Sequence, residues 1–213
     1  MSPNKSFRGF LLWGFLHCSG ALLMLFSAGG TSAAVPSQQI AVFAGGCFWG
    51  VDAVFKHVKG VTEVVSGYTG GSAASANYEQ VSEGKTGHAE AVRVRFNPAQ
   101  VTYEQLLQVF FKVAHDPTQL NRQGPDVGSQ YRSAIFYTSA EQQKASQDTI
   151  QKLTAARTFP NPVVTQVTPQ QKFYPAEKVH QNYLALHPNE PYIVIHDLPK
   201  LEQLRKQFPD LYQ

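Results

Sequence analysis

The sequence Gly-Gly-Cys-Phe-Trp-Gly at residues 45–50 places a cysteine between glycines and two aromatic residues, directly after the apolar run 40–44. The run predicts a strand, the glycines predict a tight turn, and Cys47 then falls in the first turn of a helix. Unpaired amides at a helix N-terminus stabilise a thiolate, so we expect a lowered pKa and a reactive sulfur at Cys47. The alternative is an inert core cysteine, because free cysteines are among the most buried residues.

Glu90 is the second candidate for chemistry. Within residues 88–96 it alternates in step with Val92 and Val94, whereas Arg93 takes the opposite face. A carboxyl on the apolar face of a strand, without a cationic partner, has a raised pKa and can donate a proton near neutrality. The alternative is that the strand has barely begun at Glu90, which leaves a solvated carboxylate.

Two polar segments, residues 115–119 and 123–132, lie between well-marked elements and form either a site or a solvated connection. Three histidines, His88, His115 and His180, are candidate partners for a Cys–His hydrolase, but the sequence places none of them beside Cys47. No His-x₃-His or Cys-x₂-Cys spacing occurs in the chain, so we expect no metal site.

Hydrophobic periodicity and capping residues indicate the elements that position these side chains. Their early order is strand, helix, strand, strand, helix, strand. This order predicts an α/β (α+β) fold, a ferredoxin-like two-layer sandwich with a split βαβ core and a long C-terminal extension. We expect strands at 39–44, 61–68, 88–96, 133–137 and 163–168, a loop at 69–87, and helices at 48–58, 102–114, 139–156, 176–186 and 198–208, with Thr102 and Ser139 as caps.

The first 34 of the 213 residues differ from the rest of the chain. Lys5 and Arg8 precede an uncharged run over residues 10–26, and the small residues 32–34 follow. This pattern predicts an export signal over residues 1–34, with an uncleaved membrane anchor as the alternative. Residues 35–213 form the predicted catalytic domain, which we expect in the periplasm or tethered to the membrane and facing outward.

Removal of residues 1–34 takes away Cys18 and two of the 18 basic residues, and none of the 15 acidic ones. The mature chain then has a formal net charge of +1 and Cys47 as its single cysteine, so it cannot form an internal disulfide. A charge this close to zero gives no reason to expect nucleic-acid binding.

Five motifs occur in order along the chain: GGCFWG at 45–50, GYTGG at 67–71, TGHAEAV at 86–92, HDPTQ at 115–119 and DVGSQYRS at 126–133. Together they resemble the peptide methionine sulfoxide reductase A family, over residues 40–212. The resemblance implies reduction of methionine S-sulfoxide, free or in proteins, through a sulfenic acid on Cys47 and without a cofactor.

The resemblance also implies roles for six further residues. The oxygen-binding and proton-donating residues of the family fall on Glu90, Tyr78 and Tyr131, and the aromatic residues that receive the sulfoxide methyl group fall on Phe48 and Trp49. Asp126 matches an acidic residue that the family places near the site.

Many family members reform their thiol through a second cysteine near the C-terminus, but residues 191–213 contain none. We therefore expect an external thiol, a thioredoxin-like protein or a small molecule, to attack the sulfenic acid directly. We expect a monomer. Two alternatives stay open: a noncatalytic module that binds oxidised methionine at Phe48 and Trp49, and the Cys–His thiol hydrolase.

Overall fold

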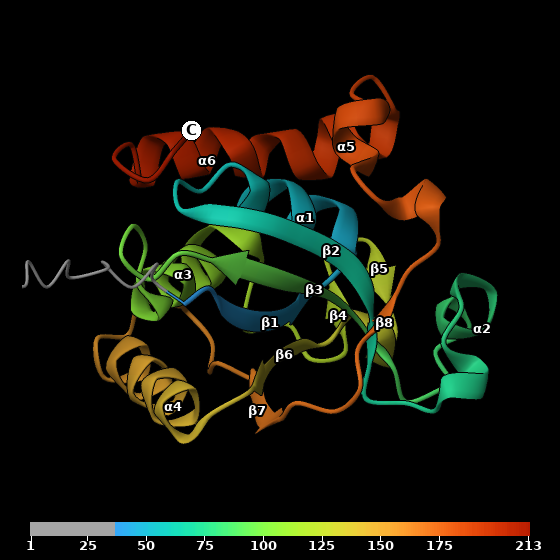
Figure 1. Ribbon diagram of the computed structural model, residues 1–213, viewed down its shortest axis with the longest axis horizontal. Helices are drawn as coiled ribbons and strands as arrows, with labels where there is room; N and C mark the ends of the chain where they lie inside the picture. Colours follow the sequence, from blue (N-terminus) through green and yellow to red (C-terminus); the bar gives the residue numbers. More distant parts are fainter. Residues whose placement is uncertain (1–36) are drawn as a thin grey trace, which may run out of the picture. The chain divides into compact units, whose positions relative to one another are not determined.

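The computed structural model describes residues 37–213, whose main sheet has six strands in the order β7-β6-β1-β3-β2-β8 (Figure 1). Neighbours in this sheet are antiparallel except for β6 and β7. A second, two-stranded sheet consists of β4 and β5. The strands are β1 (Gln39–Gly45), β2 (Val61–Thr69), β3 (Ala89–Phe96), β4 (Arg122–Gln123), β5 (Asp126–Val127), β6 (Ser133–Tyr137), β7 (Gln166–Pro169) and β8 (Tyr174–Pro175).

The predicted α/β class is confirmed. Strands β1 and β2 flank β3 and are antiparallel to it, which is the order that a split βαβ unit requires. The helices of the described residues are α1 (Phe48–Lys56), α2 (Tyr78–Ser82), α3 (Tyr103–Val109), α4 (Ala140–Ala155), α5 (Tyr183–Leu186) and α6 (Leu198–Gln207).

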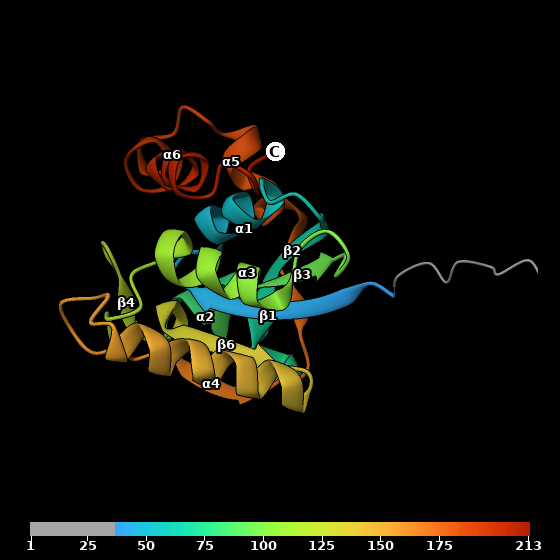
Figure 2. The same ribbon diagram turned by 90° about the vertical axis from the view of Figure 1, so that its left-hand side faces the viewer.

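Helix α1 lies between the sheet and α6 (Figure 2). Its residues Val51, Val54 and Phe55 are buried against the core at helical spacing. Phe43 of β1 stacks on Phe55 with ring centroids 5.0 Å apart, and on Phe110 at 4.8 Å. This aromatic packing fixes the junction between β1 and α1, which carries Cys47.

Helix α3 begins with the predicted capping box, because Thr102 and Gln105 each bind the backbone N–H of the other. The predicted end at Ala114 also holds, although the last five residues, Phe110–Ala114, are π-helical. Ser139 caps α4 by accepting the N–H of Gln142.

Two sequence predictions are wrong. The 69–87 segment is not all loop: it contains a 3-10 turn at Ala73–Ser75 and the short helix α2, whose cap Asn77 accepts the N–H of Gln80. No continuous helix covers 176–186. A 3-10 turn at Lys178–His180 is separated from α5 because Asn182 is left-handed, with φ 56°.

The C-terminal residues bind the far end of α1. Lys59 donates its N–H to the carbonyl of Leu211 at 2.7 Å, and Gln213 donates to the carbonyl of His57 at 3.0 Å. Val58 and Tyr212 form an antiparallel bridge between these two bonds. The C-terminal extension is thus tied to the helix that follows Cys47.

The predicted export signal or anchor lies outside the described residues. Within residues 37–213, no helix is both long and apolar enough to cross a membrane.

Candidate active site

Cys47 is the N-cap of α1, one residue after the turn that ends β1. Gly46 makes this turn with φ +92°, a conformation that L side chains rarely adopt. A side chain on Gly45 would collide with the His115 ring, 2.9 Å from the position of its Cβ. The two glycines therefore allow the chain to pass closely over His115 and present a partly buried Cys47.

The pKa of Cys47 is raised, so the prediction of a lowered pKa is wrong. Burial raises the pKa most, and the negative charges of Glu90 and Asp197 raise it further. The backbone N–H of Trp49 does lower it, as expected at a helix N-terminus, but this effect is smaller. Cys47 is therefore a protonated thiol in the free protein at neutral pH.

Glu90 lies on the apolar face of β3 and is buried, as its alternation with Val92 and Val94 predicts. Its Oε2 accepts a hydrogen bond from the backbone N–H of Phe48 at 3.1 Å. Burial raises the pKa of Glu90 to about 8, and this hydrogen bond only partly offsets the rise. A neutral carboxyl that can donate a proton thus lies beside the residue that follows Cys47.

Tyr78 and Tyr131 reach the same region from two different segments. Tyr78 is the first residue of α2, and Tyr131 ends a 3-10 turn at Ser129–Tyr131 that follows Gly128. Burial raises the pKa of both phenols, and the charges of Glu90 and Cys47 raise them further. Both hydroxyls are therefore protonated donors close to the carboxyl and the thiol.

Asp126 in β5 accepts a hydrogen bond from the hydroxyl of Tyr192 at 2.5 Å. Its negative charge raises the pKa of Cys47, Glu90 and Tyr131, although burial is the larger cause for each. Asp126 thus favours the protonated form of the groups around the thiol. The structure brings together the five residues expected to be catalytic: Cys47, Tyr78, Glu90, Asp126 and Tyr131.

Phe48 and Trp49 differ in exposure. Phe48 is fully buried under the rings of Tyr68 and His180, at centroid distances of 5.8 Å and 5.5 Å. Trp49 is partly exposed and stacks flat on Tyr183, with centroids 3.7 Å apart and an interplanar angle of 6°. Phe48 is therefore closed off from solvent, whereas Trp49 stays partly exposed with Tyr183 stacked on its ring.

The family model for peptide methionine sulfoxide reductase matches residues 39–212. The chain belongs to this family. It is 55% identical to a peptide methionine sulfoxide reductase MsrA 2 of Mesorhizobium japonicum, over 84% of this chain and 92% of the relative. It is 49% identical to a peptide methionine sulfoxide reductase MsrA of Thermus thermophilus, over 82% of this chain and 97% of the relative.

Two solved structures of reductases are similar to this chain. Reduced Mxr1 from Saccharomyces cerevisiae aligns with a TM-score of 0.67 and 32% identity, over 71% of this chain and 87% of Mxr1. Methionine sulfoxide reductase A of Corynebacterium diphtheriae aligns with a TM-score of 0.63 and 33% identity, over 72% and 76% of the two chains. The fold around the thiol is thus a peptide methionine sulfoxide reductase fold.

The three histidines weighed as hydrolase partners bind other groups in this reductase. The ring nitrogens of His115 contact the Phe110 carbonyl and the Ser133 hydroxyl. His88 contacts the backbone of residues 71 and 72, and His180 accepts the indole N–H of Trp49. Within residues 37–213, none of the three forms a hydrogen bond with Cys47, which argues against the Cys–His arrangement of a hydrolase.

Sequence reasoning missed the contribution of the C-terminal extension. Tyr183 and Tyr192 surround the Trp49 ring, and the buried carboxylate of Asp197 acts on the thiol pKa. Gly50 is the residue that admits Asp197, because a Cβ there would lie 2.1 Å from Asp197 Oδ1. A glycine inside a predicted helix was the available signal for this close approach.

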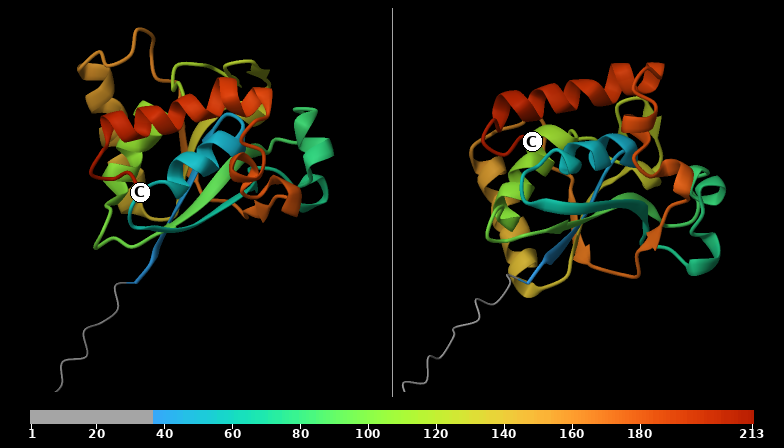
Figure 3. Two further views of the ribbon diagram at one scale, coloured as in Figure 1. Left: turned by 90° about the horizontal axis from the view of Figure 1, so that it is seen from above. Right: turned by 45° about the horizontal axis from the view of Figure 1, so that its top comes forward.

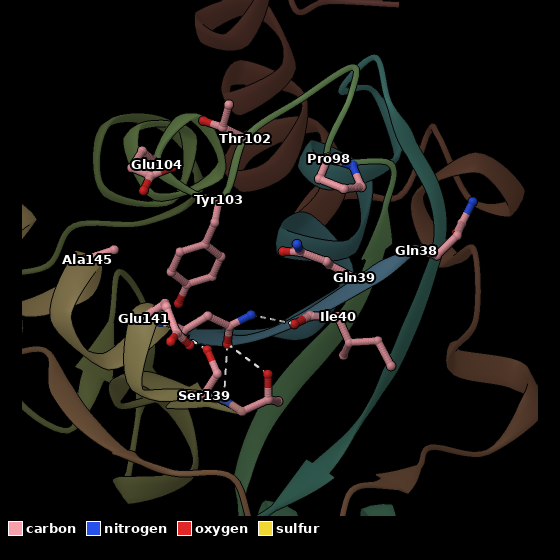
Figure 4. Close-up of a pocket in the computed structure, with 12 residues that line it drawn as sticks. Gln38, Gln39, Ile40, Pro98, Thr102, Tyr103, Glu104, Ser139, Glu141 and Ala145 are labelled. Atoms are coloured by element: carbon pink, nitrogen blue, oxygen red, sulfur yellow. Dashed lines mark hydrogen bonds between the residues drawn. The ribbon is translucent and has the colours of Figure 1, made fainter. Parts of the chain in front are cut away.

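A separate hollow of 780 Å³ lies where β1 begins, between α3 and α4 (Figure 4). Tyr103, Glu104 and Glu141 line it, together with Ile40. None of the residues around Cys47 contributes to its wall, so this hollow is not the active site of the reductase. Within residues 37–213, no three His, Cys, Asp or Glu side chains converge as metal ligands would.

Proposed function

We propose that the chain reduces methionine S-sulfoxide, free or in proteins, to methionine through Cys47. The observation that carries the proposal is the neutral carboxyl of Glu90, bound to the N–H of Phe48 beside the thiol. A sulfoxide oxygen must gain a proton before it can leave the substrate sulfur as a hydroxyl group. The site therefore joins a nucleophilic sulfur to a proton donor.

The reaction begins with both groups protonated. The sulfur of Cys47 forms a bond to the sulfoxide sulfur while Glu90 donates its proton to the sulfoxide oxygen, and the thiol proton passes to the Glu90 carboxylate. The hydroxyl group then moves to the Cys47 sulfur as its bond to the substrate sulfur and the new S–S bond both break, which gives methionine and a Cys47 sulfenic acid. Tyr78 and Tyr131 donate hydrogen bonds that stabilise the negative charge on the oxygen in the transition state.

Regeneration requires two external thiols, because Cys47 is the single cysteine of residues 35–213. The first thiol displaces water from the sulfenic acid and forms a mixed disulfide. The second releases Cys47 and leaves an external disulfide. A thioredoxin-like protein supplies both thiols from one molecule, whereas a small thiol acts twice. The monomeric chain is sufficient for each step, since one subunit contains all the groups named.

We place the enzyme outside the cytoplasm, on the sequence pattern of residues 1–34, where it repairs oxidised exported proteins. The N-terminal sequence of the natively expressed protein distinguishes a free form, which begins near Val35, from a tethered form that keeps residues 1–34.

The direct test is one turnover without reductant. The full chain is incubated separately with the S and R sulfoxides of N-acetylmethionine, and the N-acetylmethionine formed is counted per protein. We expect about one equivalent from the S isomer alone, as one sulfenic acid forms per protein. Cys47→Ser should abolish release and Cys18→Ser should retain it. A folded protein that releases nothing would instead favour the binding module, and acylation of Cys47 by an ester would favour the hydrolase.

A further inference from the structure

Glu177 binds two aromatic residues of the site through its two carboxylate oxygens. Oε2 accepts the hydroxyl proton of Tyr68 at 2.8 Å, and Oε1 accepts the backbone N–H of Tyr78 at 2.9 Å. Although partial burial raises the pKa of Glu177, hydrogen bonds from Tyr78 and Tyr68 lower it overall. The carboxylate is therefore charged near neutrality and holds both donors at once.

Tyr78 needs such an anchor because α2 has little core of its own. Of the five residues of α2, Val81 alone is buried, and Tyr78 itself is 36% exposed. Figure 3 shows α2 at the periphery of the described domain, away from α1 and α6. The cap Asn77 satisfies the N–H of Gln80, so the N–H of Tyr78 requires an acceptor from elsewhere in the chain.

Tyr68 is the fixed end of this connection. It is fully buried in β2, and it lies directly opposite Glu90 in the antiparallel pairing of β2 with β3. Its ring packs on Phe48, whose N–H binds Glu90. The chain of contacts thus runs from Glu90 through Tyr68 and Glu177 to Tyr78.

The 3-10 turn Lys178–His180, which follows Glu177, also contacts Tyr78 and Trp49. His180 lies three residues after Glu177, and its ring packs on Tyr78 with centroids 4.2 Å apart. Its Nδ1 accepts the indole N–H of Trp49 at 3.3 Å. Glu177, the N-cap of the 3-10 turn Lys178–His180, thus binds the backbone of Tyr78, and His180, the last residue of the turn, packs on its ring.

We infer that Glu177 is a positioning residue for the reductase step, which fixes Tyr78 relative to Glu90 and Cys47. This inference rests on the proposed function. Within residues 37–213 no hydrogen bond joins Glu177 to Cys47, and we expect Glu177 to act on the reaction mainly through Tyr78. Loss of its carboxylate frees the start of α2 and misplaces the Tyr78 hydroxyl at the moment when the sulfoxide oxygen is protonated.

The test is a double-variant cycle on the full chain, read by the rate of methionine release in one turnover. The concentration of the S sulfoxide of N-acetylmethionine is varied, so that the maximal rate and the half-saturating concentration are obtained separately. The variants are Glu177→Ala, Tyr78→Phe and the pair together. Glu79→Ala, which removes an exposed carboxylate from α2, is the matched control and should stay within about twofold of the original chain.

Glu177→Ala should lower the maximal rate about tenfold in the original chain, because the donor is misplaced, and less than about twofold once Tyr78→Phe has removed that donor. Glu177→Gln should recover most of the rate, since its amide oxygen can still accept the N–H of Tyr78. Equal losses in both backgrounds, or no loss in either, would overturn the inference while the original chain still releases methionine. If the original chain releases none, the proposed function itself fails.

Discussion

Glu90 accepts the backbone N–H of Phe48 at 3.1 Å, and so the carboxyl that we propose as the proton donor is hydrogen-bonded to the residue that follows Cys47. This bond crosses from β3 to the start of α1, which are 42 residues apart at these positions. The helix N-terminus thus also binds the carboxyl that we propose to protonate the substrate.

Glu90→Gln should lower the rate of one turnover by about 100-fold or more, because the amide keeps the acceptor for Phe48 but has no acidic proton. In the original chain, the rate should fall as pH rises through about 8, where Glu90 ionises. The rate of one turnover, measured against pH for the original chain and for Glu90→Gln, checks the lowered rate and the alkaline fall. A variant that keeps the original rate and the same alkaline fall would contradict the role of Glu90.

The same substitution should increase stability above neutral pH. The pKa of Glu90 rises from 4.5 to about 8 on folding, chiefly through burial. Its contribution is therefore fully present below pH 4.5 and is lost as pH rises through about 8. Urea unfolding at pH 8 should show Glu90→Gln to be more stable by about 4 kcal/mol, with the difference shrinking toward pH 4. If Glu90→Gln and the original chain were equally stable at pH 8 and also at pH 4, the raised pKa of Glu90 would be contradicted.

His115 should make the protein sensitive to acid. Burial lowers its pKa from 6.5 to about 4, so its contribution to stability is present above pH 6.5 and is lost as pH falls toward 4. The free energy of unfolding should drop by about 3 kcal/mol over this interval on account of His115. His115→Gln should reduce that dependence in urea titrations, whereas substitution of the partly exposed His196 should not.

Gly50→Ala should destabilise the attachment of the C-terminal extension. The added methyl group would lie 2.1 Å from Asp197 Oδ1 and 2.7 Å from Lys200 Nζ. We expect a loss of about 1–3 kcal/mol in thermal or urea unfolding. Adding Asp197→Ala should recover part of the loss, because it removes the oxygen in collision; a loss that persists unchanged would point to another contact.

Asp126→Asn should move the alkaline fall of the pH profile to lower pH. Burial is the main cause of the raised pKa of Glu90, and the charge of Asp126 adds to it. The amide oxygen can still accept the Tyr192 hydroxyl, so the local structure should be kept. Asp148→Asn, on the exposed side of α4, is the control and should leave the profile in place.

Local sequence patterns predicted the centre of the site but not its surroundings. Alternation placed Glu90 on the buried face, and turn chemistry placed Cys47 at the start of α1, because both depend on neighbouring residues. The thiol pKa was mispredicted chiefly because the fold buries Cys47, and also because Glu90 and the distant Asp197, 150 positions along the chain, raise it further. The part played by Glu177 likewise depends on the path of the C-terminal extension, which local periodicity mistook for a helix.

The bonds between the C-terminus and the end of α1 bear on how the enzyme responds to its surroundings. The hydrogen bonds of Lys59 and Gln213 hold the C-terminal residues against the end of α1, and residues 191–213 contain no cysteine. We therefore expect each reduction of oxidised Cys47 to require an encounter with an external thiol. The cycling rate should therefore scale with the local supply of thiol. When thiol is scarce, the enzyme should accumulate as sulfenic acid, one oxidation step from irreversible loss.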